Sequence, residues 1–110
     1  MPDYQAILKE IENQVVALAT STISECKNEA IQDGKNLLSQ MSSDLIRWMK
    51  LVAEKQLTSQ EFEWLINSDK DQVKMDALEK AGLAAERVEQ FSITVLKVIA
   101  NIALKSLIPL

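Results

Sequence analysis

The only prolines of this sequence stand at positions 2 and 109, close to its two ends. A proline inside a helix removes an amide donor and clashes with the preceding turn, so the long stretch between these positions lacks the strongest helix breaker. Glycine, the next strongest, occurs only as Gly34 and Gly82. β-Branched residues do not alternate with polar residues over any sustained stretch, as they would in strands. The chain is therefore predicted to be all-α.

A stripe of apolar and small residues follows the first half of the chain at steps of three or four. Its members are Tyr4, Leu8, Ile11, Val15, Leu18, Thr22, Cys26, Ala30, Gly34, Leu37, Met41, Leu45, Trp48 and Val52. The mean step is about 3.7 residues, close to one α-helical turn and above the 3.5 of a left-handed coiled coil. The stripe therefore favours one continuous helix over residues 3–56, with a bend or break at Gly34 as the alternative.

The start of the next helix is marked by a capping box. Thr58 and Glu61 have the required spacing, in which the hydroxyl accepts from the third helical amide and the carboxylate accepts from the Thr58 amide. Leu57 and Phe62 stand on either side, at the positions of a hydrophobic staple. We therefore predict a short helix over residues 59–67.

The same spacing returns at Ser68 and Asp71 and predicts a second short helix over residues 69–81. Gly82 follows at the position where a helix commonly ends in a left-handed residue. Beyond it we predict a last helix over residues 84–108.

The relative lengths of these helices leave two architectures open for a chain that fits a single domain, residues 1–110. A continuous first helix would be roughly 80 Å long, about twice the length of residues 58–81 or of residues 84–107. These two segments would cover both halves of it only if the chain continued in one direction at Gly82, and a reversal there would leave one half uncovered. A break at Gly34 would instead give a compact four-helix up-and-down bundle.

The last helix has an unusually wide apolar face. On a helical wheel, an arc of about 100° holds its main polar side chains. These are Glu86, Arg87, Gln90, Thr94, Lys97, Asn101 and Lys105. The remaining ~240° is almost entirely apolar. Two neighbouring helices hide about half of a helix circumference, and soluble monomers rarely expose large apolar patches. The helix must therefore occupy the centre of a compact bundle, contact another protein or contact lipid.

Contact with another protein is the leading hypothesis. The predicted interface residues are Val88, Phe91, Val95, Leu96, Val98, Ile99, Ile102 and Leu104. The expected function is a non-enzymatic helical protein–protein assembly module, and the expected partner is a second copy of the chain or another helical protein. Trp48 and Trp64 are further candidates for interface anchors, but burial of both in the core is the favoured interpretation.

Lipid contact is the alternative function. The apolar run Phe91–Ile108 holds 18 residues, which is marginal for a membrane span. Lys97 and Lys105 lie within it, and a lysine near the bilayer centre costs about 2.5–3.5 kcal/mol. An amphipathic helix at a membrane surface therefore fits the sequence better than a transmembrane helix.

The residue types needed for most active sites are missing. The sequence contains no histidine and a single cysteine, Cys26, so it lacks the usual nucleophile–base pairs and zinc ligand sets. The acidic segment that starts at Asn67 faintly resembles a calcium loop. However, Gln72 and Leu78 occupy the positions where that loop requires glycine and glutamate. We therefore expect no catalytic residues, no metal and no cofactor, and we interpret Cys26 as a small core residue.

The charge distribution bears on partners and location. The net charge is −4, which disfavours binding to the phosphate backbone of nucleic acids. Residues 57–79 hold six acids and two bases, whereas residues 80–110 hold two acids and four bases, so the asymmetry could orient a contact between copies. The first residues lack the basic segment and apolar run of a signal peptide, so a cytoplasmic location is expected.

Overall fold

The computed structural model describes residues 3–69 and 74–107. Within these residues it contains α-helices, one short 3₁₀ turn and no strand. In chain order the elements are α1 (Tyr4–Thr22), η1 (Ser24–Cys26), α2 (Lys27–Ala53), α3 (Ser59–Ser68), α4 (Asp76–Lys80) and α5 (Ala85–Leu107). The all-α prediction is confirmed.

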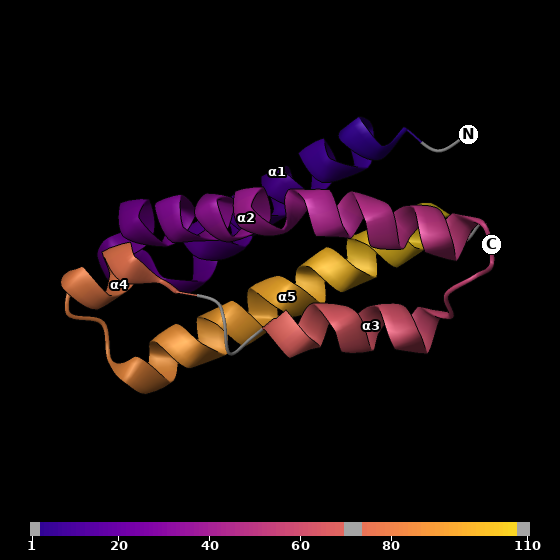
Figure 1. The fold of residues 1–110 in the computed structure, drawn as a ribbon. Coiled ribbons are helices and arrows are strands. Elements are labelled where there is room, and N and C mark those ends of the chain that lie inside the picture. Colours follow the sequence, from indigo (N-terminus) through magenta and orange to yellow (C-terminus); the bar gives the residue numbers. More distant parts are fainter. Residues whose placement is uncertain (1–2, 70–73, 108–110) are drawn as a thin grey trace.

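The helices run up and down along one long axis (Figure 1). Helix α2 returns along α1, α3 and α4 together form the third leg, and α5 runs back along them. The principal-axis extents are 43 × 23 × 22 Å. Helix α5 contacts α1, α2, α3 and α4, so it has neighbours on several sides. The arrangement corresponds to the compact four-helix alternative and not to a rod with one half uncovered.

The prediction of one helix over residues 3–56 is wrong, because the chain turns back at Ile23–Cys26 through η1. A run of hydroxyl side chains precedes this turn. Thr20 donates to the carbonyl of Val16, and Thr22 donates to the carbonyl of Leu18. Such hydrogen bonds from side chain to main chain bend helices and compete with their regular pattern. The reversal lets the apolar stripe of α1 pack on that of α2.

The alternative break at Gly34 is also wrong, since Gly34 lies inside α2. Gly34 allows α1 and α2 to approach each other closely. A Cβ atom at this position would lie only 2.6 Å from Cγ1 of Val15 in α1. The missing side chain therefore lets α1 and α2 come together at this level, which offsets the low helix propensity of glycine.

The start of α3 is as predicted. The Thr58 amide donates to Oε1 of Glu61 at 2.9 Å, and the Glu61 amide donates to Oγ1 of Thr58 at 3.1 Å. Just before this box the chain leaves α2 through Lys55, whose φ of 62° lies in the left-handed region.

The predicted helix over residues 69–81 is wrong at its start. Helix α3 continues to Ser68, Lys74 and Met75 are not helical, and α4 covers only Asp76–Lys80. The predicted partner of Ser68, Asp71, lies outside the described residues. Ser68 instead donates its hydroxyl to the carbonyl of Leu65, as side chains near a helix end often do.

The end of this helix is as predicted at Gly82, whose φ is 88°. The Gly82 amide donates to the carbonyl of Glu79 at 3.1 Å, and the Leu83 amide donates to that of Leu78 at 3.2 Å. These two hydrogen bonds define a Schellman motif. Helix α5 then begins at Ala85.

Candidate functional site

The predicted interface on α5 lies mostly inside the protein. Five of its residues are buried in the core, namely Val88, Phe91, Val95, Leu96 and Ile99. The other three are partly buried and pack against this core, namely Val98, Ile102 and Leu104. The apolar face is therefore used largely within the chain. Two neighbouring helices would hide only about half of α5, whereas α5 contacts four helices in the fold.

The polar arc of α5 is placed as expected. Gln90, Thr94, Lys97, Asn101 and Lys105 are all exposed. They form a continuous polar strip along the outer side of the helix, with the half-buried apolar side chains at its edges. What α5 presents to solvent is therefore chiefly this strip.

The two tryptophans differ sharply in exposure. Trp48 in α2 is a core residue at 9% exposure, whereas Trp64 in α3 is 69% exposed. Among the residues that the structure describes, Trp64 is the only large hydrophobic side chain in the exposed class. Phe62 and Ile66, four residues apart, form the buried face of α3. Trp64 stands two residues from each and therefore points about 200° away from them.

This spacing was a usable sequence signal. An apolar pair at positions i and i+4 fixes the buried face of a short helix, and a residue between them must lie opposite. The predicted burial in the core is thus confirmed for Trp48 and wrong for Trp64, and only Trp64 stays a candidate for an interface anchor.

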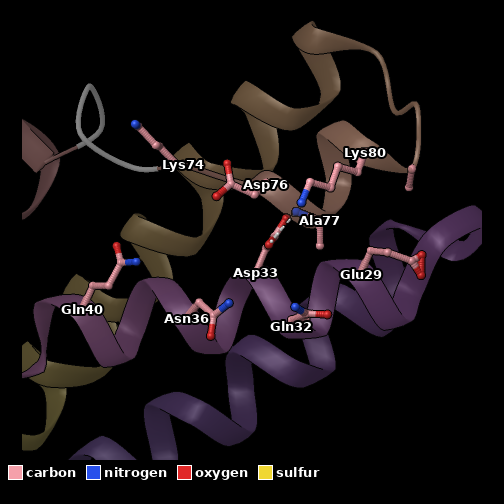
Figure 2. Close-up of a pocket in the computed structure, with 10 residues that line it drawn as sticks. Glu29, Gln32, Asp33, Asn36, Gln40, Lys74, Asp76, Ala77 and Lys80 are labelled. Carbon is pink, nitrogen blue, oxygen red and sulfur yellow. Dashed lines mark hydrogen bonds between the residues drawn. The ribbon is translucent and has the colours of Figure 1, made fainter.

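A polar groove separates α2 from α4 (Figure 2). Its volume is about 590 Å³. From α2, Gln32, Asn36 and Gln40 line it at intervals of four residues, and Lys74 and Lys80 lie on the opposite side. Amide and ammonium groups of this kind can hydrogen-bond many ligands, so the groove by itself does not define a reaction or a ligand class.

Asp33, which also lines the groove, has a structural function. Its side chain is only 2% exposed. Oδ1 accepts from the Ala77 amide at 3.1 Å, and Oδ2 accepts from the Leu78 amide at 2.8 Å. Both carboxylate oxygens are thus used to cap the N-terminus of α4, where the helix dipole also favours a negative charge.

An ion pair links the start of α5 to the turn between α1 and α2. The Arg87 guanidinium donates to the Glu25 carboxylate in η1, and its Nη2 also donates to the Thr22 carbonyl at 3.4 Å. The hydrogen bond from Arg87 is the main reason that the pKa of Glu25 is lowered. Both side chains are exposed enough that the pair is expected to contribute little to stability by itself.

Cys26 lies next to this ion pair and is half-buried. Its pKa is raised by desolvation and by the nearby carboxylates of Glu29 and Glu25. The reactive thiolate is therefore disfavoured at neutral pH. The side chain packs against the core, as expected for a small core residue.

Within residues 3–69 and 74–107, no group of three histidine, cysteine, aspartate or glutamate side chains is placed to hold a metal ion. No family model matches the chain, and neither a curated protein nor a solved structure matches it. The remaining candidate site is the outer surface of α3 around Trp64.

Proposed function

We propose that this chain is a non-enzymatic helical protein–protein assembly module that binds a second copy of itself through Trp64. The observation that carries this proposal is the 69% exposure of that side chain. Tryptophan is enriched among the residues that dominate interface energies, because it buries a large area and loses little conformational freedom. An exposed tryptophan beside a well-packed core is therefore a natural anchor.

Charge complementarity favours a second copy as the partner. Glu61 and Glu63 flank Trp64 and are exposed, so the outer face of α3 is acidic. The polar strip of α5 carries Lys97 and Lys105, also exposed. If the α5 strip of one copy contacts α3 of the next, the opposite charges orient the contact, and a lysine can lie over the indole ring.

In this arrangement α5 contributes to assembly through its outer edge. The half-buried side chains of Val98 and Ile102 border the polar strip and add apolar area. When α3 of one copy contacts α5 of the next and this contact is not reciprocated, the assembly is heterologous and builds rings or open chains instead of a closed dimer.

Light scattering after gel filtration over a micromolar concentration series tests the proposal. The mass should rise with concentration beyond that of a dimer, and Trp64→Ser should restore a monomer of unchanged thermal stability. Trp48→Phe is the matched control, since it removes the buried tryptophan and should leave assembly intact. A wild-type monomer at every concentration would refute self-association.

Lipid binding is the second candidate, favoured by one observation on α5. This 23-residue helix contains an 18-residue window with a mean hydropathy of 1.3, of which 39% is buried in the fold. A core helix of a soluble protein passes the same composition test, so vesicle binding itself has to be measured. Co-sedimentation with anionic vesicles at low salt tests it, and protein left entirely in the supernatant would eliminate this function.

A further inference from the structure

The groove between α2 and α4 contains a row of side-chain amides that the fold itself does not use (Figure 2). Gln32, Asn36 and Gln40 are all exposed and line the groove from α2. Within residues 3–69 and 74–107, the side-chain hydrogen bonds of α2 are made by other residues, namely Asp33, Ser42, Asp44 and Arg47. The donors and acceptors of the three carboxamides therefore face the groove as partners for a ligand.

The spacing of this row restricts the kind of ligand. Residues four apart on a helix form rows that are inclined by about 26° to the helix axis, so neighbouring members of a row are about 6.7 Å apart. An extended peptide repeats the same side of its main chain every two residues, which is about 6.4–6.8 Å. Such a chain meets each of the three carboxamides in the same way. The row is about 13 Å long, the length of about four extended residues.

The chemistry of a carboxamide also matches that of a peptide main chain. Each carboxamide has two N–H donors and a carbonyl acceptor, so it pairs with both the N–H and the C=O of one peptide residue. In an extended chain these two groups of every second residue point to the same side, as they do in an antiparallel β-ladder. Main-chain hydrogen bonds of this kind provide affinity when a strand adds to an exposed sheet edge. The row on α2 offers comparable partners without a sheet.

The opposite side of the groove complements this row. Ala77 and Ala81 have small side chains, which leave space beside α4. Lys74 and Lys80 lie on the same side and carry ammonium donors for carbonyl oxygens. The volume of about 590 Å³ falls within the range of sites that bind small ligands. A main chain lying between α2 and α4 thus has hydrogen-bonding partners on both sides.

The remaining lining disfavours other classes of ligand. Glu29 and Asp76 balance the two lysines, and the carboxylate of Asp33 is used in the cap of α4, so the lining does not select a strongly charged ligand. Among the described residues that line the groove there is no aromatic side chain on which a nucleobase could stack. The only apolar side chains are those of the two alanines, which are too few for an apolar ligand.

We infer that this groove binds a peptide segment of about four residues in an extended conformation, chiefly through its main chain. Gln32, Asn36 and Gln40 exchange hydrogen bonds with alternate residues of the segment, and the lysines donate to its other carbonyls. This inference goes beyond the proposed function. The described residues that line the groove belong to α2, to α4 and to positions next to α4, so the surface around Trp64 takes no part.

An NMR titration with a peptide of small uncharged side chains tests the inference, because main-chain binding does not depend on the peptide sequence. The probe is acetyl-Ala-Ser-Ala-Ser-Ala-amide. The side-chain amide resonances of Gln32, Asn36 and Gln40 should shift together and saturate at millimolar peptide concentrations. The same peptide with every amide N-methylated lacks the donors and should bind at least about tenfold more weakly. Absence of shifts at these three residues, or equal binding of the two peptides, would overturn the inference.

Asn36→Ala removes the central carboxamide and should weaken peptide binding about tenfold. The variant should remain folded, because Asn36 is exposed and alanine has the higher helix propensity. Asn101→Ala is the matched control, since it removes an exposed carboxamide from the polar strip of α5, outside the groove. Equal affinities of the two variants for the peptide would contradict recognition by the row on α2.

Trp64→Ser separates this inference from the proposed function. It should abolish assembly through α3 and leave the peptide-induced shifts unchanged, whereas Asn36→Ala should weaken peptide binding and leave assembly intact. Loss of the peptide-induced shifts in Trp64→Ser would place the peptide on α3 and would refute binding in the groove. Loss of self-association alone would leave the groove as a separate site.

Discussion

Helix α3 begins with a cap supplied by its own residues, whereas α4 begins with a cap supplied by α2. In α3, Thr58 and Glu61 exchange hydrogen bonds over three residues at the surface. In α4, a buried Asp33 accepts from amides 44 and 45 residues away in sequence. The first helix end can form as soon as its own segment is helical, and the second requires the packed fold.

The two caps are expected to contribute differently to the free energy of unfolding. An exposed cap competes with water for the same amides and is worth about 1 kcal/mol. A buried carboxylate that satisfies two amides is worth more, because its loss leaves buried donors without partners. Helix α4, with five residues, is far too short to be stable alone. Its position therefore depends on α2.

The largest effect is expected from removing the cap that Asp33 provides to α4. Asp33→Ala should lower the free energy of unfolding by about 3 kcal/mol, because two buried amides lose a charged acceptor. Urea denaturation measures the loss, and hydrogen exchange of the Ala77 and Leu78 amides should accelerate. Asp33→Asn keeps the shape and one acceptor oxygen and should cost less. A loss for Asp33→Ala no greater than that of an exposed cap would contradict this comparison.

Gly34→Ala compares the effect of helix propensity on stability with the effect of packing between α1 and α2. Propensity alone predicts a gain of about 1 kcal/mol in helix α2. The new Cβ would lie 2.6 Å from Val15 Cγ1, and valine has little rotamer freedom to move aside. We expect a net loss of about 1–2 kcal/mol by thermal or urea denaturation. In a Val15→Ala background the same substitution should become neutral or stabilising. A gain in the wild-type background would show that the helices are not tightly apposed.

Thr58→Ala should cost about 1 kcal/mol, the usual effect of removing a helix cap. Thr58→Ser keeps the hydroxyl and is the control. Because the cap is local, the effect should add to that of Asp33→Ala in the double variant. Strong coupling between them would mean that α3 and α4 form as one unit.

The smallest expected effect is a pH dependence at Glu61. Hydrogen bonds from Thr58 lower the pKa of Glu61 from its ordinary value of 4.5. The carboxylate therefore stabilises the fold above this value, and the contribution is lost as the pH falls through the lowered pKa of the folded state. Glu61→Gln keeps the box geometry without the charge, so its stability should change less between about pH 5 and pH 3. NMR titration of Glu61 gives the pKa itself.

The features that sequence predicted are those whose partners lie a few residues apart. The box at Thr58, the left-handed stop at Gly82 and the polar strip of α5 all follow from local spacing. The turn at Ile23–Cys26 could not be found this way, because apolar and small residues continue through it at steps of four, a spacing that also occurs within helices. The interaction of Asp33 with α4 was equally hidden, since sequence spacing does not reveal which segments meet in space.

The candidate site shows the same division. The wide apolar face of α5 could be predicted from sequence. The exposure of that face depends on the number of neighbouring helices, which is set by the topology of the fold. Val95 and Ile99 were therefore expected at an interface and lie in the core. Trp64 could have been placed from the spacing of Phe62 and Ile66, which fixes the inward side of α3.

Lys55, at the end of α2, holds a left-handed conformation that glycine adopts at much lower cost. A positive charge at this position also interacts favourably with the carboxyl-terminal end of the helix dipole. The connection from α2 to α3 is thus a compromise between backbone geometry and electrostatics. Substitution of Lys55 is therefore a starting point for raising the thermal stability of the bundle, because one surface residue carries both the backbone contribution and the charge contribution.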